Sequence, residues 1–536
     1  MRGEGFLSSF YKGIVVANMR IMLAFLCIIS VVSTSKIACD LTEKTYFVDD
    51  AIWRNAIILV IGVIALYFVR KFIPHRRMVY LIIIFLASII WVFTTGFTPR
   101  SDQMSLYAGM IGLRKGEYAL FADGGYFMQN PQQFGLVFLY YLWSFIWGYE
   151  RIWPFLILNV LAITFLYKKL GDICIHLGMD KKYKAYVALL GILFYPLMMY
   201  TTFFYGTLLG LSFAVAAIDH EIEFFDTFKL KHEICAMVFI ILAVFAKTNC
   251  TIFMIGMLVY ACVEVFRKRR RVTNIFLFVL LVSAVIAVKS PLIIEQKMTG
   301  MGDGRAVSSW SYVAMGLQEG PRSYGWFNSY TWGTYDSVDE EGNPNQAEVA
   351  KQEIKDRIKV FISNTDYARE FFLKKLASQW NNPTFEAYWV NQVSDPEIEQ
   401  SDLIKAFISK QGCNGAYGYL DAFMMLVYFG ALAAFWLKDD FDVKDLTLAT
   451  VFIGGFLFHI FWEAKGQYTI SYFVLLFPYA ITGFKLIFER VRQKRRLNYK
   501  KVAMFAVVLA LLLFVFGNKI GTLSADTESW NQYIQS

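Results

Sequence analysis

The feature that most constrains this chain is a series of long apolar runs that recurs along nearly its whole length. An α-helix needs roughly 17–25 apolar residues to cross about 30 Å of bilayer hydrocarbon. By this rule the sequence predicts about thirteen transmembrane helices, and so an all-α polytopic membrane protein. We expect the spans near residues 14–34, 55–72, 79–96, 152–168, 184–203, 206–220, 234–248, 249–266, 274–294, 416–437, 446–463, 468–487 and 500–518.

The composition agrees with a chain that is solvated by lipid. Hydrophobic residues make up 57% of the 536 positions and charged residues only 18%. A soluble domain of this kind would expose a large apolar surface to water, whereas a bilayer accommodates it. The net charge of +9 lies in short Lys and Arg clusters between the apolar runs. Such clusters are typical of membrane topology signals, so we expect no nucleic-acid partner.

The basic clusters also predict the orientation, because cytoplasmic loops are enriched in Lys and Arg. All five clusters fall on one side only if the apolar run at residues 134–147 does not cross the membrane. This run is short for a span, so we expect a helix at the outer surface. The N-terminus is then cytoplasmic and the C-terminus extracytoplasmic. The clusters are Arg70/Lys71/Arg76/Arg77, Lys168/Lys169 with Lys181/Lys182/Lys184, Lys229/Lys231, Arg267 to Arg271, and Arg490/Arg492/Lys494/Arg495/Arg496.

This topology divides the chain into membrane blocks and outer segments. The segment 297–415 is the only stretch long enough for a small folded domain, and it has helical patterning near residues 345–380. Cys39 and Cys413 fall in loops that we expect outside, so a disulfide between them is one alternative. The expected parts are 1–96 (the first three spans), 97–151 (an outer loop with the surface helix), 152–296 (spans), 297–415 (an extracytoplasmic loop domain), 416–521 (the last spans) and 522–536 (an outer tail).

An acidic residue, Asp102, follows the third span directly. A carboxylate so close to a span end is costly unless it is solvated, paired or functional. The alternative is a helix cap, in which Ser101 or Asp102 accepts hydrogen bonds from the backbone of the next turn.

Three further polar groups lie at outer ends of spans. Lys247 stands alone between two apolar runs, where it either snorkels to the interface or contacts a phosphate. Because these groups come from distant parts of the chain but share one surface, we expect them to form one cavity at the membrane boundary. The other two are the turn Asp123-Gly124-Gly125-Tyr126 with Asn130-Pro131-Gln132-Gln133, and the link Glu463-Ala464-Lys465-Gly466-Gln467-Tyr468, with His459 one helical turn before Glu463.

The order of these short motifs resembles the GT-C superfamily of polyprenyl-phosphate-dependent glycosyltransferases. It is most similar to the bacterial family-39-like proteins related to protein mannosyltransferases and aminoarabinose transferases, of the Gram-positive type. The resemblance covers roughly residues 95–480, and it departs from relatives at Asp102-Gln103, where an Asp-Glu pair is common. The motifs are Ser101-Asp102-Gln103, Gly124-Gly125-Tyr126, Asn130 to Gly135 before the surface helix, Lys247-Thr248, and Glu463 to Tyr468 followed by Pro478.

The resemblance implies a glycosyltransferase of the bacterial plasma membrane. It would move a hexose or pentose from a polyprenyl-phosphate donor to an extracytoplasmic acceptor (a cell-surface polymer, a glycolipid or a protein) by inverting displacement. Asp102 would be the general base. No cofactor is expected, and a divalent metal held by Asp102 with help from Glu463 is kept as an alternative. Donor phosphate contacts are expected from Lys247, Lys465 and Arg100, with Arg322 as a further candidate, and substrate contacts from Gln103, Asp123, Tyr126, Gln132, Gln133, His459, Glu463, Gln467 and Tyr468.

Two other functions fit a chain with many spans. A transporter or lipid flippase of cell-envelope precursors tends to place its charged sites near the bilayer midplane, between repeats. Here the charges gather at one face and no repeat is evident. A membrane polymerase or ligase acting on diphosphate-linked donors would also use outer loops, although typically with several Arg residues.

Overall fold

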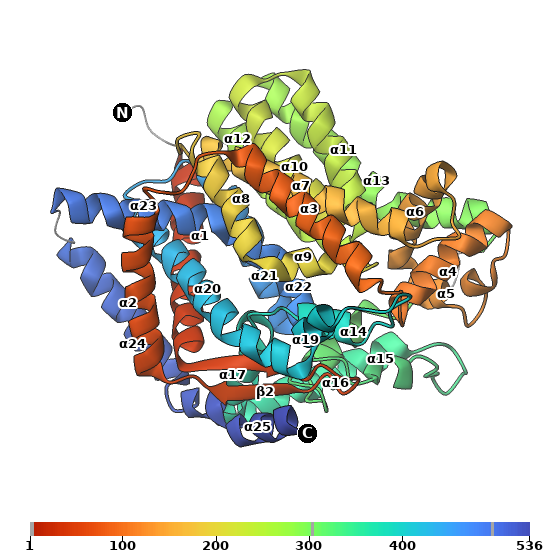
Figure 1. The fold of residues 1–536 in the computed structure, drawn as a ribbon. Helices are drawn as coiled ribbons and strands as arrows, with labels where there is room; N and C mark the ends of the chain where they lie inside the picture. The colour runs from red at the N-terminus through yellow and green to blue at the C-terminus, as the bar shows by residue number, and fades with distance from the viewer. Residues whose placement is uncertain (1–4, 302–304, 495–497) are drawn as a thin grey trace.

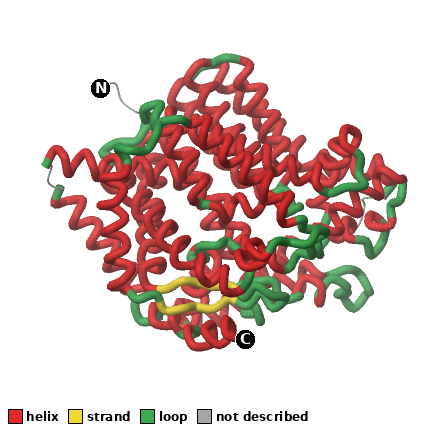
Figure 2. Tube along the Cα trace, viewed as in Figure 1, coloured by secondary structure: helices red, strands yellow, loops and turns green. Residues whose placement is uncertain are grey.

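The computed structural model describes residues 5–301, 305–494 and 498–536, and helices dominate it (Figure 1, Figure 2). Each predicted span coincides with a helix or with a pair of consecutive helices. The long helices are α1 (Phe6–Val32), α2 (Ile52–Val69), α3 (Arg77–Thr95), α7 (Trp153–His176), α8 (Tyr183–Leu193), α10 (Thr207–Thr227), α11 (Leu230–Ala246), α12 (Thr251–Lys268), α13 (Arg271–Thr299), α20 (Lys410–Leu437), α21 (Thr447–Phe461), α23 (Phe477–Gln493) and α24 (Tyr499–Phe516). The helices of the connecting segments and of the chain end are α4 (Asp102–Lys115), α5 (Tyr126–Gln129), α6 (Phe134–Trp147), α9 (Tyr195–Met199), α14 (Ser309–Gly316), α15 (Tyr330–Gly333), α16 (Gln346–Ser363), α17 (Thr365–Trp380), α18 (Ala387–Gln392), α19 (Asp402–Ile408), α22 (Gly466–Phe473) and α25 (Thr527–Gln535).

Fewer helices meet the length and apolarity expected of a membrane span than the sequence predicts. Within the described residues, ten helices are long and apolar enough to cross a membrane, or eleven if the bent pair around Phe194 counts as one span. The helices α10 and α11 fall outside this set. The helix α11 has only 17 residues, and the second half of α10 carries Asp219, Glu221, Glu223 and Asp226. A helical, multi-pass membrane protein is therefore confirmed, whereas thirteen spans are not.

Lipid must be the solvent for the outermost helices. Only 6% of the apolar window of α2, and the same share of that of α24, is buried inside the protein. Large side chains such as Ile61, Phe68 and Phe514 are more than half exposed. A continuous apolar surface of this kind is not stable in water.

The helix that the sequence predicts at the outer surface has the predicted bounds. The helix α6 covers Phe134–Trp147 and has 14 residues, which gives a length of about 21 Å. It packs against α4 and against the end of α11, and a side chain at Gly135 would collide with the backbone of Phe245. This close approach brings the first outer segment to the end of α11, where Lys247 lies.

A β-hairpin stands where the sequence predicts a loop between the first two spans. The strands β1 (Ser33–Ile37) and β2 (Thr45–Asp49) pair antiparallel, with Ser33 opposite Asp49 and Ile37 opposite Thr45. This hairpin is a small addition to an otherwise helical fold, so the predicted all-α class is confirmed. The hairpin is held by distant segments, since the Ser35 amide donates to the Asn381 carbonyl at 3.0 Å and the Phe47 amide to Asp526 at 3.0 Å.

The final segment, which the sequence predicts as an outer tail, is ordered against this hairpin. It contains α25, which packs on β2, and Trp530 of α25 is buried. The chain end is therefore part of the folded structure.

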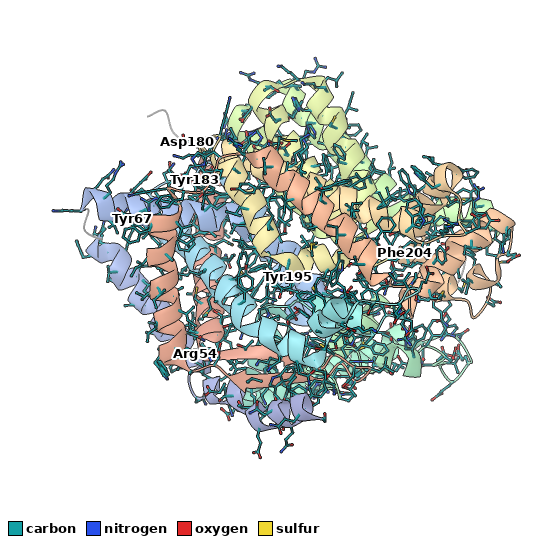
Figure 3. All side chains as sticks on the ribbon, viewed as in Figure 1. Arg54, Tyr67, Asp180, Tyr183, Tyr195 and Phe204 are labelled. Carbon is teal, nitrogen blue, oxygen red and sulfur yellow. The ribbon has the colours of Figure 1, made fainter. Side chains whose placement is uncertain are left out.

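The basic loops gather at one end of the helical bundle, and the hairpin with α14–α19 and α25 gathers at the other (Figure 1). Figure 3 shows Asp180 and Tyr183 near the first end and Arg54 near the second. Ion pairs connect the basic loops: Arg77–Asp172 at 2.9 Å, Arg267–Asp442 at 2.6 Å and Lys501–Asp439 at 2.7 Å. Arg2, Arg495 and Arg496 lie outside the described residues.

The length of α6 generates a topology prediction. Because about 21 Å of helix cannot cross about 30 Å of hydrocarbon, reporter enzymes fused after Gly124 and after Arg151 are expected on the same side of the membrane. A fusion after Lys181, at the basic end, should report the opposite side. Alkaline phosphatase and green fluorescent protein fusions measure this, and opposite sides for Gly124 and Arg151 would mean that α6 spans the bilayer.

Candidate functional site

Asp102 begins α4 and points away from the core. Ser101, which precedes it, has a φ of 49° and makes no side-chain capping bond. The helix-cap alternative therefore does not account for Ser101 in this structure. The Asp102 carboxylate is exposed and accepts a hydrogen bond from the Tyr205 hydroxyl at 3.1 Å.

Tyr205 connects Asp102 to the other outer segments. Its hydroxyl accepts from Gln133 Nε2 at 2.8 Å, and the ammonium group of Lys247 lies 3.8 Å from the centre of its ring. Burial and the neighbouring Asp102 carboxylate raise the pKa of Tyr126. Residues from four separate segments thus form one polar cluster.

Lys247 is the unpaired cation of this cluster. It lies at the joint between α11 and the short 3-10 helix Thr248–Cys250, and none of the described carboxylates forms an ion pair with it. Burial lowers its pKa to about 7, although Asp102 and Glu463 act in the opposite direction. The chain can approach this joint because Gly206, at a φ of 75°, has no side chain to collide with the Ala246 carbonyl.

A cavity opens beside Lys247, between α10, α12 and α22. The cavity is narrow, and its wall is partly polar and partly apolar. The lining residues are Thr207, Leu211, Lys247, Asn249, Cys250, Phe253, Gln467, Tyr468, Ser471 and Tyr472.

The link between α21 and α22 adds a second carboxyl group. Glu463 is only 7% exposed and accepts from the Tyr468 hydroxyl at 3.4 Å. Burial raises its pKa to about 7; Lys465 opposes this shift, while Glu43 and Asp102 reinforce it. His459 is buried, and its ring stacks on Tyr468 at a centroid distance of 5.8 Å.

Lys465 differs from Lys247 because its charge is already compensated. It forms an ion pair with Glu43, and Glu386 lies 3.8 Å away. Burial alone would lower the pKa of Lys465, but Glu43 and Glu386 raise it above its ordinary value. Arg322 pairs with the other oxygen of Glu43 at 2.9 Å. Lys465 and Arg322 are therefore held in a buried charge network rather than presented to a ligand.

Several residues predicted as ligands support the cluster instead of lining it. The Gln103 side chain accepts from the Phe204 amide at 2.8 Å, next to Tyr205. Arg100 donates to the Val393 carbonyl and lies 3.6 Å from Asp395, so it faces the large outer segment.

The remaining predicted residues lie close to the cluster or at its edge. The Gln132 carbonyl accepts from Thr248 at 2.9 Å, which ties the first outer loop to the Lys247 joint. The Gln467 side chain lines the cavity, and its backbone amide donates to Glu386 at 3.1 Å. Asp123 is exposed on the turn before α5.

Sequence reasoning missed Tyr205, Glu43 and Glu386. The only signal for Tyr205 is its place beside Gly206 between two apolar runs. Glu43 and Glu386 resemble ordinary loop carboxylates in the sequence, and only their burial, at 2% and 1% exposure, sets them apart. An aromatic stack was also missed, in which the rings of Tyr312 and Trp462 lie 5.2 Å apart.

The arrangement combines an exposed carboxylate, a lysine without a described carboxylate partner and a narrow, partly apolar cavity. Such a set can accept a proton and neutralise an anion. Across residues 5–301, 305–494 and 498–536, no group of three or more His, Cys, Asp or Glu side chains is arranged to hold a metal ion.

Comparisons with known protein families, with curated proteins and with solved structures found no match. The function is therefore argued from the geometry of this site.

The two lysines generate a stability prediction. Lys465→Met would leave Glu386 buried without a cation and Glu43 with Arg322 alone, and removing one partner of a buried pair costs about 3–5 kcal/mol. Lys247→Met removes a cation that has no carboxylate partner, so little change is expected. Thermal unfolding of the detergent-solubilised variants measures the contrast. An equal loss of stability in both variants would contradict the distinction between them.

Proposed function

We propose that this protein is an integral membrane glycosyltransferase that moves a sugar from a polyprenyl-phosphate donor to an extracytoplasmic acceptor. The single observation that carries the proposal is the short path from an exposed carboxylate to an uncompensated lysine: Asp102 accepts from Tyr205, and Lys247 lies on the ring of Tyr205. The proposed base and the cation therefore both contact the side chain of Tyr205, the base at its hydroxyl and the cation at its ring. A displacement at a phosphorylated carbon needs both groups.

The donor side of the site uses Lys247 and the cavity. A polyprenyl phosphate has a compact anionic group and a long apolar chain. Lys247 suits the phosphate as a point charge. The hydroxyl and amide groups of Thr207, Asn249 and Gln467 offer further donors, and the apolar wall with Leu211 and Phe253 suits the first isoprene units.

Glu463 fits this assignment because its pKa, raised to about 7, leaves it mostly neutral below pH 7. A neutral carboxyl group can donate a hydrogen bond to a phosphate or to a sugar hydroxyl. An ionised carboxylate at the same place would repel the donor phosphate.

The acceptor side uses Asp102. Its carboxylate is exposed, so an acceptor hydroxyl can reach it from the aqueous face. In the proposed step Asp102 takes the proton of this hydroxyl while the acceptor oxygen attacks the anomeric carbon. The bond between that carbon and the phosphate oxygen breaks, and the lipid phosphate leaves with the electron pair. Attack from the face opposite the leaving group inverts the anomeric configuration.

The orientation follows from the basic loops. They lie at the end of the bundle opposite the hairpin and α14–α19 (Figure 1), and the positive-inside rule assigns such an end to the cytoplasm. The cluster around Asp102 would then face the exterior of a bacterial plasma membrane, where polyprenyl-phosphate sugars meet their acceptors.

The role of Asp102 generates an activity prediction. Asp102→Asn removes the base but keeps the shape, so the rate of transfer is expected to fall roughly 10²–10⁴-fold. Glu117→Gln is a matched control, because Glu117 is also an exposed carboxylate of the segment 97–151 but makes no described side-chain contact with Tyr205 or Lys247. The measurement is transfer of radiolabel from polyprenyl-phosphate hexoses to membrane acceptors by purified protein.

Full activity of Asp102→Asn in that assay would contradict the assignment of Asp102 as the general base. Movement of labelled lipid across reconstituted vesicles without a new glycosidic bond would instead support a transporter or flippase.

The shifted pKa values generate a pH prediction. Lys247 loses its charge and Glu463 gains one as the pH rises through about 7. Both changes disfavour an anion, so the affinity for a short-chain polyprenyl phosphate is expected to fall as the pH rises from 6 to 8. Lys247→Arg keeps its charge throughout, so its affinity should depend less on pH. Binding measured by calorimetry tests this, and an affinity that rises with pH would contradict it.

A further inference from the structure

Two cysteine side chains from opposite parts of the chain meet beside the hairpin. Cys39 lies just after β1 and Cys413 lies in the first turn of α20, and their sulfur atoms are 3.5 Å apart. Cys413 is 1% exposed, whereas Cys39 is partly exposed. The other five cysteines lie in helical segments along α1, α7, α11 and α12.

We propose that Cys39 and Cys413 form a disulfide bond that fastens the hairpin to α20. A disulfide has an S–S length of about 2.05 Å, so the sulfurs need to approach by roughly 1.5 Å. Small side-chain rotations provide a movement of this size. Segments 374 positions apart would thereby be joined on the face of the protein that carries the hairpin.

The bond forms by exchange with an external disulfide. The thiolate of Cys39, the more accessible of the two, attacks one sulfur of the external disulfide and releases its first thiol. The Cys413 thiolate then attacks the Cys39 sulfur of the mixed disulfide and releases the second. Two protein thiols are oxidised and one external disulfide is reduced to two thiols, which carry the two protons away.

The surroundings favour a bond that persists once it is made. Cys413 is 1% exposed, so attack by external thiols on the finished bond is hindered by this enclosure. Hydrogen bonds already fix the segments that carry the two cysteines. The Cys39 amide donates to the Tyr533 hydroxyl at 2.9 Å, and Lys36, before Cys39, donates to Asn414, after Cys413, at 3.4 Å.

The bond would also position a charge of the candidate site. The hairpin turn that follows Cys39 carries Glu43, which pairs with Lys465 and Arg322. The same turn accepts a hydrogen bond from Trp389 Nε1 at the Asp40 carbonyl, at 2.9 Å. Fastening this turn to α20 therefore limits the movement of Glu43 relative to Lys465. The bond requires an oxidising compartment on the hairpin face. It does not depend on the proposed transfer reaction.

The test counts thiols in the full-length protein, expressed in a bacterium whose periplasm is oxidising. Cells are treated with N-ethylmaleimide at lysis, and the purified protein is denatured in fresh N-ethylmaleimide, so that buried free thiols also react, and analysed by mass spectrometry. We expect label on five of the seven cysteines and a peptide cross-link between Cys39 and Cys413 that reductant removes. Label on all seven would overturn the proposal, and it would leave the transfer assay unaffected.

Variants separate the bond from general effects of reduction. Reductant is expected to lower the thermal unfolding temperature of the wild type and of Cys235→Ser, the control, which changes a half-buried cysteine of α11. It should not lower that of the double variant Cys39→Ser/Cys413→Ser. A cross-link from Cys39 to any other cysteine in the Cys413→Ser variant, at wild-type yield, would show that the pairing is not specific and would also overturn the proposal.

Discussion

The connection between α21 and α22 is the part of the structure on which the candidate site depends most. Lys465 pairs with Glu43 of the hairpin turn and lies near Glu386 of the outer segment. The Trp462 carbonyl accepts from Lys375 at 2.9 Å, and the Ala464 amide donates to the Gly325 carbonyl at 2.8 Å. Three distant segments thus fix one short link. The buried charges in it are tolerable only because each has a counter-ion or a hydrogen-bond partner.

Lys247 stands in contrast to this network and gives the site its chemical character. Its charge is not neutralised by any described carboxylate, and the proposed function assigns it to the donor phosphate. The cost of an uncompensated cation is limited by partial exposure and by the face of Tyr205. Lys465 is paired with carboxylates and supports the fold. Lys247 has no described carboxylate partner, and under the proposed function it is the lysine that binds the donor.

Much of the architecture could be predicted because lipid imposes a simple rule on the sequence. Long apolar runs indicate helices, and a run of fourteen residues at α6 indicates one that is too short to span. Asp102 and Lys247 could be selected because a charge next to an apolar run is unusual. The β-hairpin could not be predicted, since Ser33–Ile37 and Thr45–Asp49 are too short and too mixed in polarity to stand out. Its hydrogen-bond partners, Asn381 and Asp526, lie hundreds of residues away.

The sequence by itself determined a helical membrane chain, the places where most helices begin and end, and the charged residues that need an explanation at the ends of spans. Hydropathy and charge are local properties, so they can be read along the chain. Only the tertiary structure decided that Tyr205 joins Asp102 to Lys247, that Glu43 compensates Lys465, and that Cys39 meets Cys413. Each of these contacts brings together segments far apart in the chain, and proximity of that kind arises from packing, which no local pattern encodes.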